Sequence, residues 1–380
     1  LATAIAAQVG TGNLAGAATA IAMGGPGAIF WMWVSAFLGM ATIYAEALMA
    51  QKYKQVGDDG TVTGGPVYYI RAAFTGKFGK ILAATFAVLI IFALGFMGNA
   101  VQSNSIGDAF GTAFGINPWI VGIIIAAISL FVFVGGISRI ASLTEKIVPI
   151  MAAFYIVGAL IVIICNGNMI PKAFHDIFVG AFNPQAIGGG VLGWTVSRAL
   201  ARGVGRGLFS NEAGMGCGAI VSAAAECSHP AKQGLIQSFS IYVDTLFIGT
   251  ATALIILLTG TFDVCDGAGN LLLDQTGGIE AGIKWTQYAL MNTFGTWSGK
   301  ALAIIIVLFV FTSMTGYCYQ AEANIRYLTH NSKLAVNICR AVSLQPHFRA
   351  IVNADAIWSM GDIGYGLMAW ANIIAIALLA

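Results

Sequence analysis

The first 25 residues constrain the fold of this chain more than any other stretch. They carry no charged side chain and are long enough to cross a bilayer, for which a helix needs about 20 mainly apolar residues. Residues 10–13 are GTGN, and each glycine there costs about 1 kcal/mol of helix stability relative to alanine. Because irregular backbone at membrane depth is tolerated only inside protein or beside a wet cavity, the pattern predicts a spanning helix broken near its midpoint.

Two other interpretations apply to the same glycines. Gly10, Gly12 and Ala15 satisfy the G-x-G-x-x-A form of the dinucleotide-binding motif, but the flanks are apolar helix rather than strand and soluble helix. Gly12 and Gly16 also form a G-x-x-x-G pattern, which is typical of close helix packing in membranes. Close packing of Gly12 and Gly16 is compatible with a substrate-binding role for the same segment, so packing and binding both stay open.

The composition identifies an all-α polytopic membrane protein with a single transmembrane domain, residues 1–380. Apolar residues make up 58% of the chain and charged residues 9%, whereas soluble domains carry about 25% charged residues. The six cysteines show no C-x-x-C spacing, and the chain contains neither G-x-S-x-G nor H-E-x-x-H. We therefore expect no enzyme activity, no cofactor and no nucleic-acid partner.

Further apolar runs predict the remaining spans. They cover residues 27–53, 79–103, 118–137, 146–165, a helix starting at the glycines 188–190, and then 233–259, 300–327 and 356–380. A short interfacial helix is expected at 64–74, a loop with Pro171 and Pro184 after the fifth span, and an acidic loop at 260–296. Residues 331–353 are too polar for a complete span, so the ninth helix is expected to be atypical.

The basic residues predict the orientation. If the spans alternate and the N-terminal end is cytoplasmic, all 18 lysines and arginines except Lys172, Lys284 and Lys300 fall on the inner side. This distribution follows the positive-inside rule. We therefore expect an integral, multi-pass protein of the plasma (inner) membrane.

A second interruption, GRGLFSNEAGMG at residues 205–216, divides the sixth helix. It lies five helices after the first break, and a repeat with an odd number of spans must recur with inverted topology. Paired broken helices in an inverted repeat are the best sequence indication of a transporter's central binding site. The repeats are expected at about residues 1–165 and 186–380.

Several segments resemble the alanine or glycine:cation symporter family. They are GGPGAIFWMWVSAFLG at 24–39, VGTGNLAGAATAIAMGG ahead of it, GRGLFSNEAGMG, ASLTEKIVPIMAAFY at 141–155 and GLMAWANIIAIALL near the end. The resemblance covers nearly the whole chain and implies a leucine-transporter-type fold of two inverted five-helix repeats, with broken helices 1 and 6. It also implies cation-coupled uptake of small neutral amino acids such as alanine or glycine, usually with sodium. The departure is 331–353, where the family has an apolar ninth helix.

The substrate site is expected at the two breaks. The carboxylate of an amino acid needs partners in a low-dielectric cavity, and the chain offers no well-placed intramembrane lysine or arginine. Backbone N–H groups freed at the first break are the alternative, at the positive end of the following half-helix. The candidate substrate-binding residues are Gly10, Thr11, Gly12, Asn13, Phe209, Ser210 and Asn211, with Phe209 limiting the size of the substrate side chain.

The coupling ion is expected beside helix 8. Thr312 and Ser313 lie about 18 Å from the outer end of that helix, at the depth of the first break. The family fold implies a sodium site between helices 1 and 8, which these hydroxyls would line; alternatively, they bond back to their own helix. Asp244, an acid well inside a span, is a candidate for proton or charge relay. Its alternative is a pair with a polar neighbour, such as an Asn or Tyr of another helix.

The other charged residues within predicted spans are expected mainly at aqueous surfaces. Glu46 is expected to be solvated near the inner interface, and Arg198, Arg202 and Arg206 to form an inner-surface face. Glu212 either lines the cavity or faces cytoplasmic water.

The function predicted from these features is sodium-coupled symport of a small amino acid by alternating access. Proton coupling is the first alternative. A channel is the second, although a channel would need charge rings or repeated filter loops. The expected partners are the amino acid, the cation and the lipid bilayer, and no pattern sets the oligomeric state.

Overall fold

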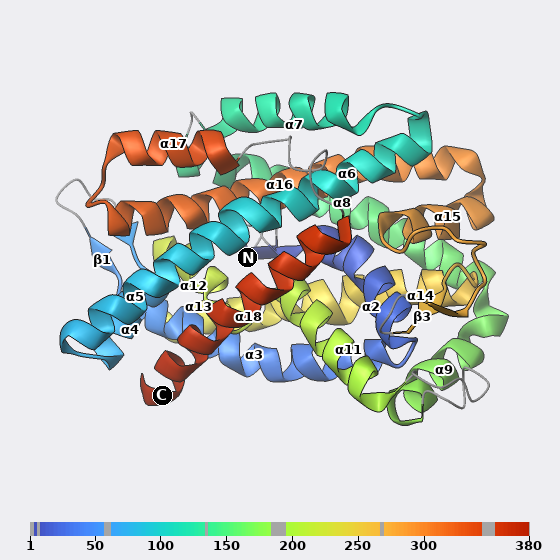
Figure 1. Ribbon diagram of the computed structural model, residues 1–380, viewed down its shortest axis with the longest axis horizontal. Coiled ribbons are helices and arrows are strands. Elements are labelled where there is room, and N and C mark those ends of the chain that lie inside the picture. Colours follow the sequence, from blue (N-terminus) through green and yellow to red (C-terminus); the bar gives the residue numbers. More distant parts are fainter. Residues whose placement is uncertain are drawn as a thin grey trace.

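The computed structural model is a bundle of helices with two short hairpins (Figure 1). It describes residues 4–5, 8–56, 62–133, 136–183, 195–266, 270–343 and 354–379. β1 and α4 lie at one end of the bundle in Figure 1, and α9, α15 and β3 lie at the other. The glycines 188–190, where the sixth helix was expected to start, lie outside the described residues.

The elements of the first half begin and end as follows. They are η1 (Gly12–Gly16), α2 (Ala17–Gly24), α3 (Ala28–Lys52), β1 (Gln55–Val56), β2 (Val62–Thr63), α4 (Pro66–Ala73), α5 (Gly76–Ile90), η2 (Ile91–Gly98), α6 (Asn99–Phe114), α7 (Pro118–Phe133) and α8 (Gly136–Cys165). A one-turn helix, η3 (Gly167–Met169), then leads to α9 (Ile170–Phe182).

The elements of the second half follow the same order as the predicted spans. They are α11 (Val196–Asn211), α12 (Cys217–Ala224), α13 (Pro230–Ile241), η4 (Tyr242–Gly249), α14 (Thr250–Leu258), β3 (Val264–Cys265), β4 (Leu271–Leu273), α15 (Ile283–Phe294), α16 (Thr296–Leu328), α17 (Lys333–Ser343) and α18 (Ala354–Leu379).

Both predicted helix breaks are present. Val9 and Gly10 form a bend, and the π-helix η1 follows before regular α-helix resumes in α2. In the sixth helix, α11 and α12 are separated at 212–216, where Glu212, Gly214 and Gly216 all have positive φ. Two of these three positions are glycine, which adopts this left-handed backbone without steric cost.

Two other spans run without a break and are longer than predicted. The third helix is one span, Gly76–Phe114, in which η2 joins α5 to α6. The seventh is one span, Pro230–Leu258, in which η4 replaces regular α-helix at the middle. π-helical segments inside α-helices are frequent at functional sites, and η4 contains Asp244.

Two predicted loops are corrected because they contain helices. The loop with Pro171 contains α9, which is bent by 75° from the helix Ile150–Cys165. The acidic loop at 260–296 contains the hairpin β3–β4 and α15. Both helices are too short to span, so a search for long apolar runs misses them.

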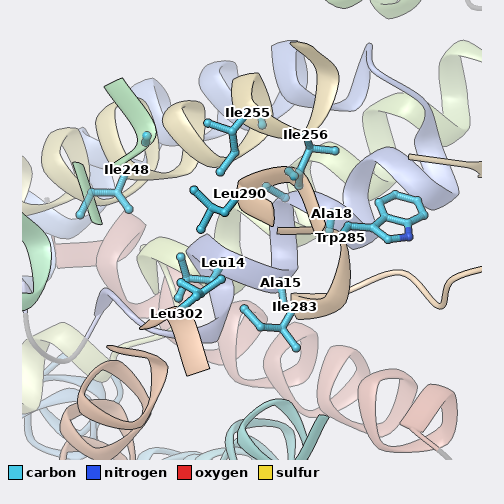
Figure 2. Close-up of a cluster of buried hydrophobic side chains, with 14 of the residues drawn as sticks. Leu14, Ala15, Ala18, Ile248, Ile255, Ile256, Ile283, Trp285, Leu290 and Leu302 are labelled. Carbon is cyan, nitrogen blue, oxygen red and sulfur yellow. The ribbon is translucent and has the colours of Figure 1, made fainter. Parts of the chain in front are cut away.

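α15 covers the half of helix 1 that follows its break. Leu14 and Ala15 of η1 lie in one buried apolar cluster with Ile255 of α14 and Leu290 of α15 (Figure 2). The hydroxyl of Thr286 in α15 also donates a hydrogen bond of 2.6 Å to the Leu14 carbonyl. This packing holds η1 rigidly from one side and leaves its other side for the polar centre of the bundle.

The arginine stripe lies at the opposite end from the one predicted. Arg202 packs at Gly24 of α2, and the charge of Asp266 acts on Arg198, so these residues lie at the β3–β4 end. The prediction was wrong because the stripe precedes the break in helix 6 and therefore belongs to the half-helix that enters from that end. Arg206 is only 3% exposed and pairs with Asp362 of α18 through two bonds of 2.8 and 3.1 Å.

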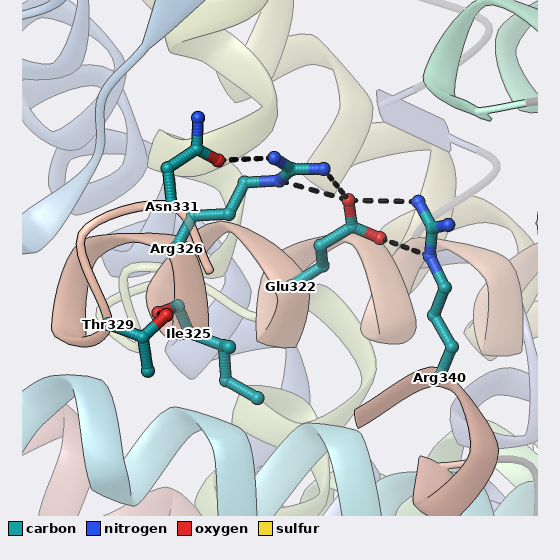
Figure 3. Close-up of polar contacts among 6 residues, drawn as sticks. All are labelled: Glu322, Ile325, Arg326, Thr329, Asn331 and Arg340. Atoms are coloured by element: carbon teal, nitrogen blue, oxygen red, sulfur yellow. Dashed lines mark hydrogen bonds and ion pairs between the residues drawn. The ribbon is translucent and has the colours of Figure 1, made fainter. Parts of the chain in front are cut away.

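The weak stretch 331–353 is described only as far as α17, an 11-residue helix that is shorter than a span. It packs on α16 and is held there by charge (Figure 3). Glu322 of α16 accepts bonds of 2.8 and 3.0 Å from Arg340 and also binds Arg326. Arg340 is therefore a paired charge at the surface of α16.

We expect Arg340→Ala to lower the free energy of unfolding by about 1.5–3 kcal/mol, as for other hydrogen bonds to charged groups. Its side chain is 23% exposed and that of Glu322 14%, so water screens the pair only partly. Thermal unfolding of the purified protein in detergent measures the effect. Lys333→Ala, at an exposed position of the same helix, should change stability by less than about 0.5 kcal/mol. Equal melting temperatures for the two variants would show that the pair does not hold α17.

Candidate functional site

The two breaks meet at a polar network around Asn13. The Asn13 amide nitrogen donates to the Asp244 carbonyl and to its carboxylate Oδ1, both at 2.8 Å, and the Gly10 N–H donates to Asn13 Oδ1 at 3.0 Å. These bonds fix the orientation of the amide because its nitrogen can only donate. Asn13 therefore closes the gap in helix 1 and joins it to η4.

Asp244 is fully buried, and both of its carboxylate oxygens accept hydrogen bonds. Its Oδ2 receives bonds of 2.8 Å from the hydroxyls of Ser210 and Thr245. The Thr245 hydroxyl itself accepts from Asn211 at 3.2 Å, so its own hydrogen is directed to Asp244. Among the described residues, no lysine or arginine forms an ion pair with this carboxylate. The network thus stabilises a negative charge through neutral donors alone.

Of the predicted residues, the structure brings together Gly10, Asn13, Ser210, Asn211 and Asp244. The alternative that Asp244 pairs with a polar neighbour is met by Asn13, from the broken helix 1. Whether the same carboxylate relays protons or charge stays a prediction. The sequence reasoning missed Thr245, which stands next to the predicted Asp244.

Two glutamines at the first break were also missed. Gln102 of α6 accepts from the Thr11 N–H at 3.4 Å. Both side-chain polar atoms of Gln8, and the hydroxyl of Thr11, are buried without a hydrogen-bond partner in the described structure. Such groups are rare in proteins, since leaving one unpaired costs about 1–3 kcal/mol. A glutamine inside an apolar span was the available signal for both.

The backbone N–H groups at the first break are not free in this state. Gly10 donates to Asn13 Oδ1, Thr11 donates to Gln102, and the Asn13 N–H donates to the Gly10 carbonyl at 3.3 Å. The physical reason is that a buried break pairs its own backbone with nearby amide side chains. A substrate carboxylate would therefore have to displace these acceptors, and the binding role of the three N–H groups stays a prediction.

Gly12 is a packing contact between the two broken helices. A Cβ placed there would lie 2.8 Å from the Ser210 Cα, so no larger residue fits without separating η1 from α11. A Cβ on Gly16 would meet only the Thr11 carbonyl oxygen, at 4.0 Å. The packing interpretation therefore holds for Gly12 and not for Gly16.

Thr312 and Ser313 bond back to their own helix, but Ser313 also reaches helix 1. Both hydroxyls donate to the Phe309 carbonyl, at 2.8 and 3.2 Å. The Ser313 hydroxyl lies 3.4 Å from the Val9 carbonyl oxygen, and a Cβ on Gly10 would approach it to 2.4 Å. The predicted meeting of helix 8 hydroxyls with the first break is present for Ser313.

Phe209 is buried against α18 and contacts Tyr365, with 5.2 Å between the ring centroids. This contact does not place it against the Asn13 network, so its effect on substrate size stays a prediction.

A second buried carboxylate, Glu46, lies at the break in helix 6. It is fully buried, and its Oε1 accepts from the Gly216 N–H at 3.1 Å and from the amide of Asn372. The expectation of a solvated Glu46 is wrong because distance along α3 does not measure exposure: α4, α12 and α18 all pack near this part of α3.

We expect Gly12→Ala to destabilise the folded protein by about 1–3 kcal/mol, the usual cost of overpacking a close contact. Gly16→Ala is the matched control, because it has open space and gains up to about 1 kcal/mol of helix propensity. Thermal unfolding of both variants measures the difference. A stable Gly12→Ala protein would show that the two broken helices are not in close contact at this point.

Comparison with known proteins agrees with this architecture. The sequence model of the sodium:alanine symporter family matches residues 1–380. A putative sodium/proton-dependent alanine carrier of Bacillus subtilis is 43% identical, over all of this chain and 78% of that protein. The sodium/alanine symporter of Methanococcus maripaludis is 39% identical, over all of this chain and 81% of that protein. A probable sodium/glutamine symporter of Bacillus subtilis is 41% identical, over 99% of this chain and 74% of its own length.

Solved structures share the fold at low sequence identity. A manganese transporter of Eremococcus coleocola superposes with a TM-score of 0.61 at 13% identity, over 99% of this chain and 77% of that one. A nucleobase-cation-symport-1 family transporter superposes with a TM-score of 0.56 at 13% identity, over 97% and 76% of the two chains. Both are leucine-transporter-like. With the family match over its whole length, this chain belongs to the sodium:alanine symporter family.

Proposed function

We propose that this protein is a symporter that couples the entry of a small neutral amino acid to sodium by alternating access. The observation that supports it best is the network of Asn13, Ser210 and Asp244, which joins both broken helices to η4 at a fully buried point. In transporters built from inverted repeats, substrate and ion sites lie where discontinuous helices meet.

The substrate is proposed to bind at this network as a zwitterion. Asp244 supplies a negative charge that no basic residue of the described chain pairs, and an ammonium group is its natural partner. The carboxylate would take the N–H groups of Gly10 and Thr11, replacing the side-chain oxygens that now accept from them. The unpaired groups of Gln8 and Thr11 offer further donors.

The proposed class of substrate is supported by the charge of this centre and by the names of the relatives. Two relatives are named for alanine and one for glutamine, all of which are neutral amino acids. A net-neutral ligand suits a site with one unpaired negative charge if a cation enters with it. The remaining predicted residues, Gly12, Asn211 and Phe209, then shape the site rather than carry charge.

Sodium is proposed to bind beside Ser313 and Thr312. Sodium is a hard cation that takes oxygen ligands, and the Ser313 hydroxyl and Val9 carbonyl already lie close together. No group of three or more His, Cys, Asp or Glu side chains in the described structure is arranged to hold a metal ion. The ion site is therefore proposed from hydroxyls and broken-helix carbonyls.

Alternating access is proposed to move one repeat against the other, with repeats at about 1–165 and 186–380. The protein would lie in the plasma membrane with its N-terminal end inside. A channel is less well supported, because the buried centre described here contains one hydrogen-bonded carboxylate rather than a ring of charge.

The first test is uptake of labelled alanine into proteoliposomes, with sodium replaced by potassium and pH varied independently. Uptake should follow the sodium gradient. The double variant Thr312→Ala with Ser313→Ala should raise the half-saturating sodium concentration about tenfold or more, the equivalent of ~1.4 kcal/mol. Thr329→Ala, which removes an exposed hydroxyl directly after the end of the same helix, should leave it unchanged. An unaltered sodium dependence in the double variant would place the ion elsewhere.

The second test concerns the amino acid. Asn13→Ala should weaken alanine binding by about 1.5–3 kcal/mol, because it removes the charged hydrogen bond that holds the Asp244 carboxylate in place beside the first break. Asp244→Asn should weaken it more, since it removes the charge. Calorimetry on purified protein measures both, with Asn337→Ala on the surface of α17 as the control. Wild-type affinity in Asp244→Asn would exclude it as the partner of the ammonium group.

A further inference from the structure

The break in helix 6 has a buried carboxylate at each end. Glu212 stands at its beginning, at the end of α11, and Glu46 of α3 binds Gly216 at its end. Neither group is paired with a lysine or arginine among the described ion pairs. Of the two, only Glu46 accepts hydrogen bonds that offset the cost of burying a carboxylate, one from a backbone N–H and one from a side-chain amide.

Glu212 has no such compensation. It is 1% exposed, and neither of its oxygens has a hydrogen-bond partner in the described structure. Tyr317 and Gln320 of α16 lie close enough to interact with it, but neither forms a hydrogen bond of standard geometry with the carboxylate. An isolated carboxylate in such a site is very costly as an anion and is stable only when it takes up a proton.

The groups around Glu212 reinforce this conclusion. The titratable side chains that act on it are all acids or weak acids, and they come from five elements around the break: Glu46 of α3, Asp244 of η4, Cys217 of α12, Tyr317 of α16 and Tyr365 of α18. Arg206, which precedes the break on α11, is engaged with Asp362. One buried acceptor, Gln320 Oε1, also lacks a partner and is available to the hydroxyl of a protonated Glu212.

The backbone supplies an independent observation. Glu212 has φ of 58°, in the left-handed region that glycine and asparagine occupy more readily. A glutamate in this position is conformationally unfavourable, and no hydrogen bond of its side chain offsets that cost. Strained backbone of this kind is concentrated at functional sites.

Asp244 differs from Glu212 in the number of hydrogen bonds that its carboxylate accepts. Its carboxylate receives Asn13, Ser210 and Thr245, and the direction of the Thr245 hydroxyl is set by Asn211. An anion therefore has three hydrogen-bond donors at Asp244 and none of standard geometry at Glu212. Because Ser210 precedes Glu212 by only two residues, a movement of the break changes the surroundings of both carboxylates together.

We propose that Glu212, rather than Asp244, is the proton-binding group of the transport cycle. In the structure described here, where Glu212 is buried, a proton is bound to one carboxylate oxygen, forming a buried carboxylic acid. When the break in helix 6 opens to water, the O–H bond breaks, the proton passes to water, and the carboxylate is hydrated. The proposal rests on the proposed symport, because it is the transport movement that exposes the break.

The first experiment does not depend on transport. Infrared spectroscopy of purified wild-type protein should show a carbonyl-stretching band of a buried protonated carboxylic acid. Glu212→Gln should lose this band, whereas Glu226→Gln, an exposed glutamate beyond α12, should keep it. The same band in wild type and Glu212→Gln, or no such band in wild type, would overturn the proposal.

The second experiment measures proton movement. Proteoliposomes with a trapped pH-sensitive dye, and with the membrane potential clamped by potassium and valinomycin, receive alanine and sodium. Wild type and Glu226→Gln should change the internal pH as alanine enters, and Glu212→Gln should take up alanine with the pH change abolished. A pH change that persists in Glu212→Gln, or is absent in wild type during alanine uptake, would contradict the proposal. Failure of wild type to take up alanine would instead count against the proposed function, and the infrared band would then decide the role of Glu212.

Discussion

The structure depends on how the broken first helix satisfies its polar groups inside a bilayer. Asn13 provides the solution, because its amide oxygen accepts from the Gly10 backbone and its nitrogen donates twice to Asp244. One side chain therefore stabilises the gap in helix 1 and the unpaired charge in η4 at the same time. Without such a partner, each freed backbone group would cost several kcal/mol at membrane depth.

The contacts around Asn13 join the two broken helices and η4, which are the parts that a transporter has to move. Ser210 contacts Gly12 through its backbone and Asp244 through its hydroxyl, so the two breaks and η4 share one contact point. α15 supports η1 from the other side through an apolar cluster and the Thr286 hydroxyl. In the proposed mode of binding, the carboxylate of the ligand replaces the side-chain oxygens of Asn13 and Gln102, which would couple binding to the conformation of the first break.

Much of this arrangement could be predicted from the sequence, because membrane spans and helix breaks have strong local signals. Glycine clusters gave the positions of both breaks, and a lone acid in an apolar helix indicated Asp244. The pairing of Asn13 with Asp244, and the burial of Glu46, depend on which helices pack together and have no local signal. Gln102 is an intermediate case, since an amide in an apolar span is visible in the sequence but its partner at Thr11 is not.

The sequence reasoning failed most clearly where it inferred exposure from position along a helix. Arg206 and Glu46 were both assigned to an aqueous face, yet each is buried against other helices. The short helices α9 and α15 were read as loops for a different reason: with 13 and 12 residues, they are too short to give the long apolar run of a span. Hydropathy reports the average surroundings of a segment, whereas these features depend on single contacts.

The contacts of α18 show how the broken sixth helix is held at more than one point. Asp362 binds Arg206, which precedes the break, whereas Asn372 binds the Gly214 carbonyl within it and Glu46 beside it. These two positions on α18 are about 15 Å apart along the helix axis. Opening toward the β3–β4 end would separate the ion pair, and opening toward the β1–β2 end would separate the amide contacts. The two sets of bonds share no residue, so breaking one leaves the other intact, which is the property that the proposed alternating access would need.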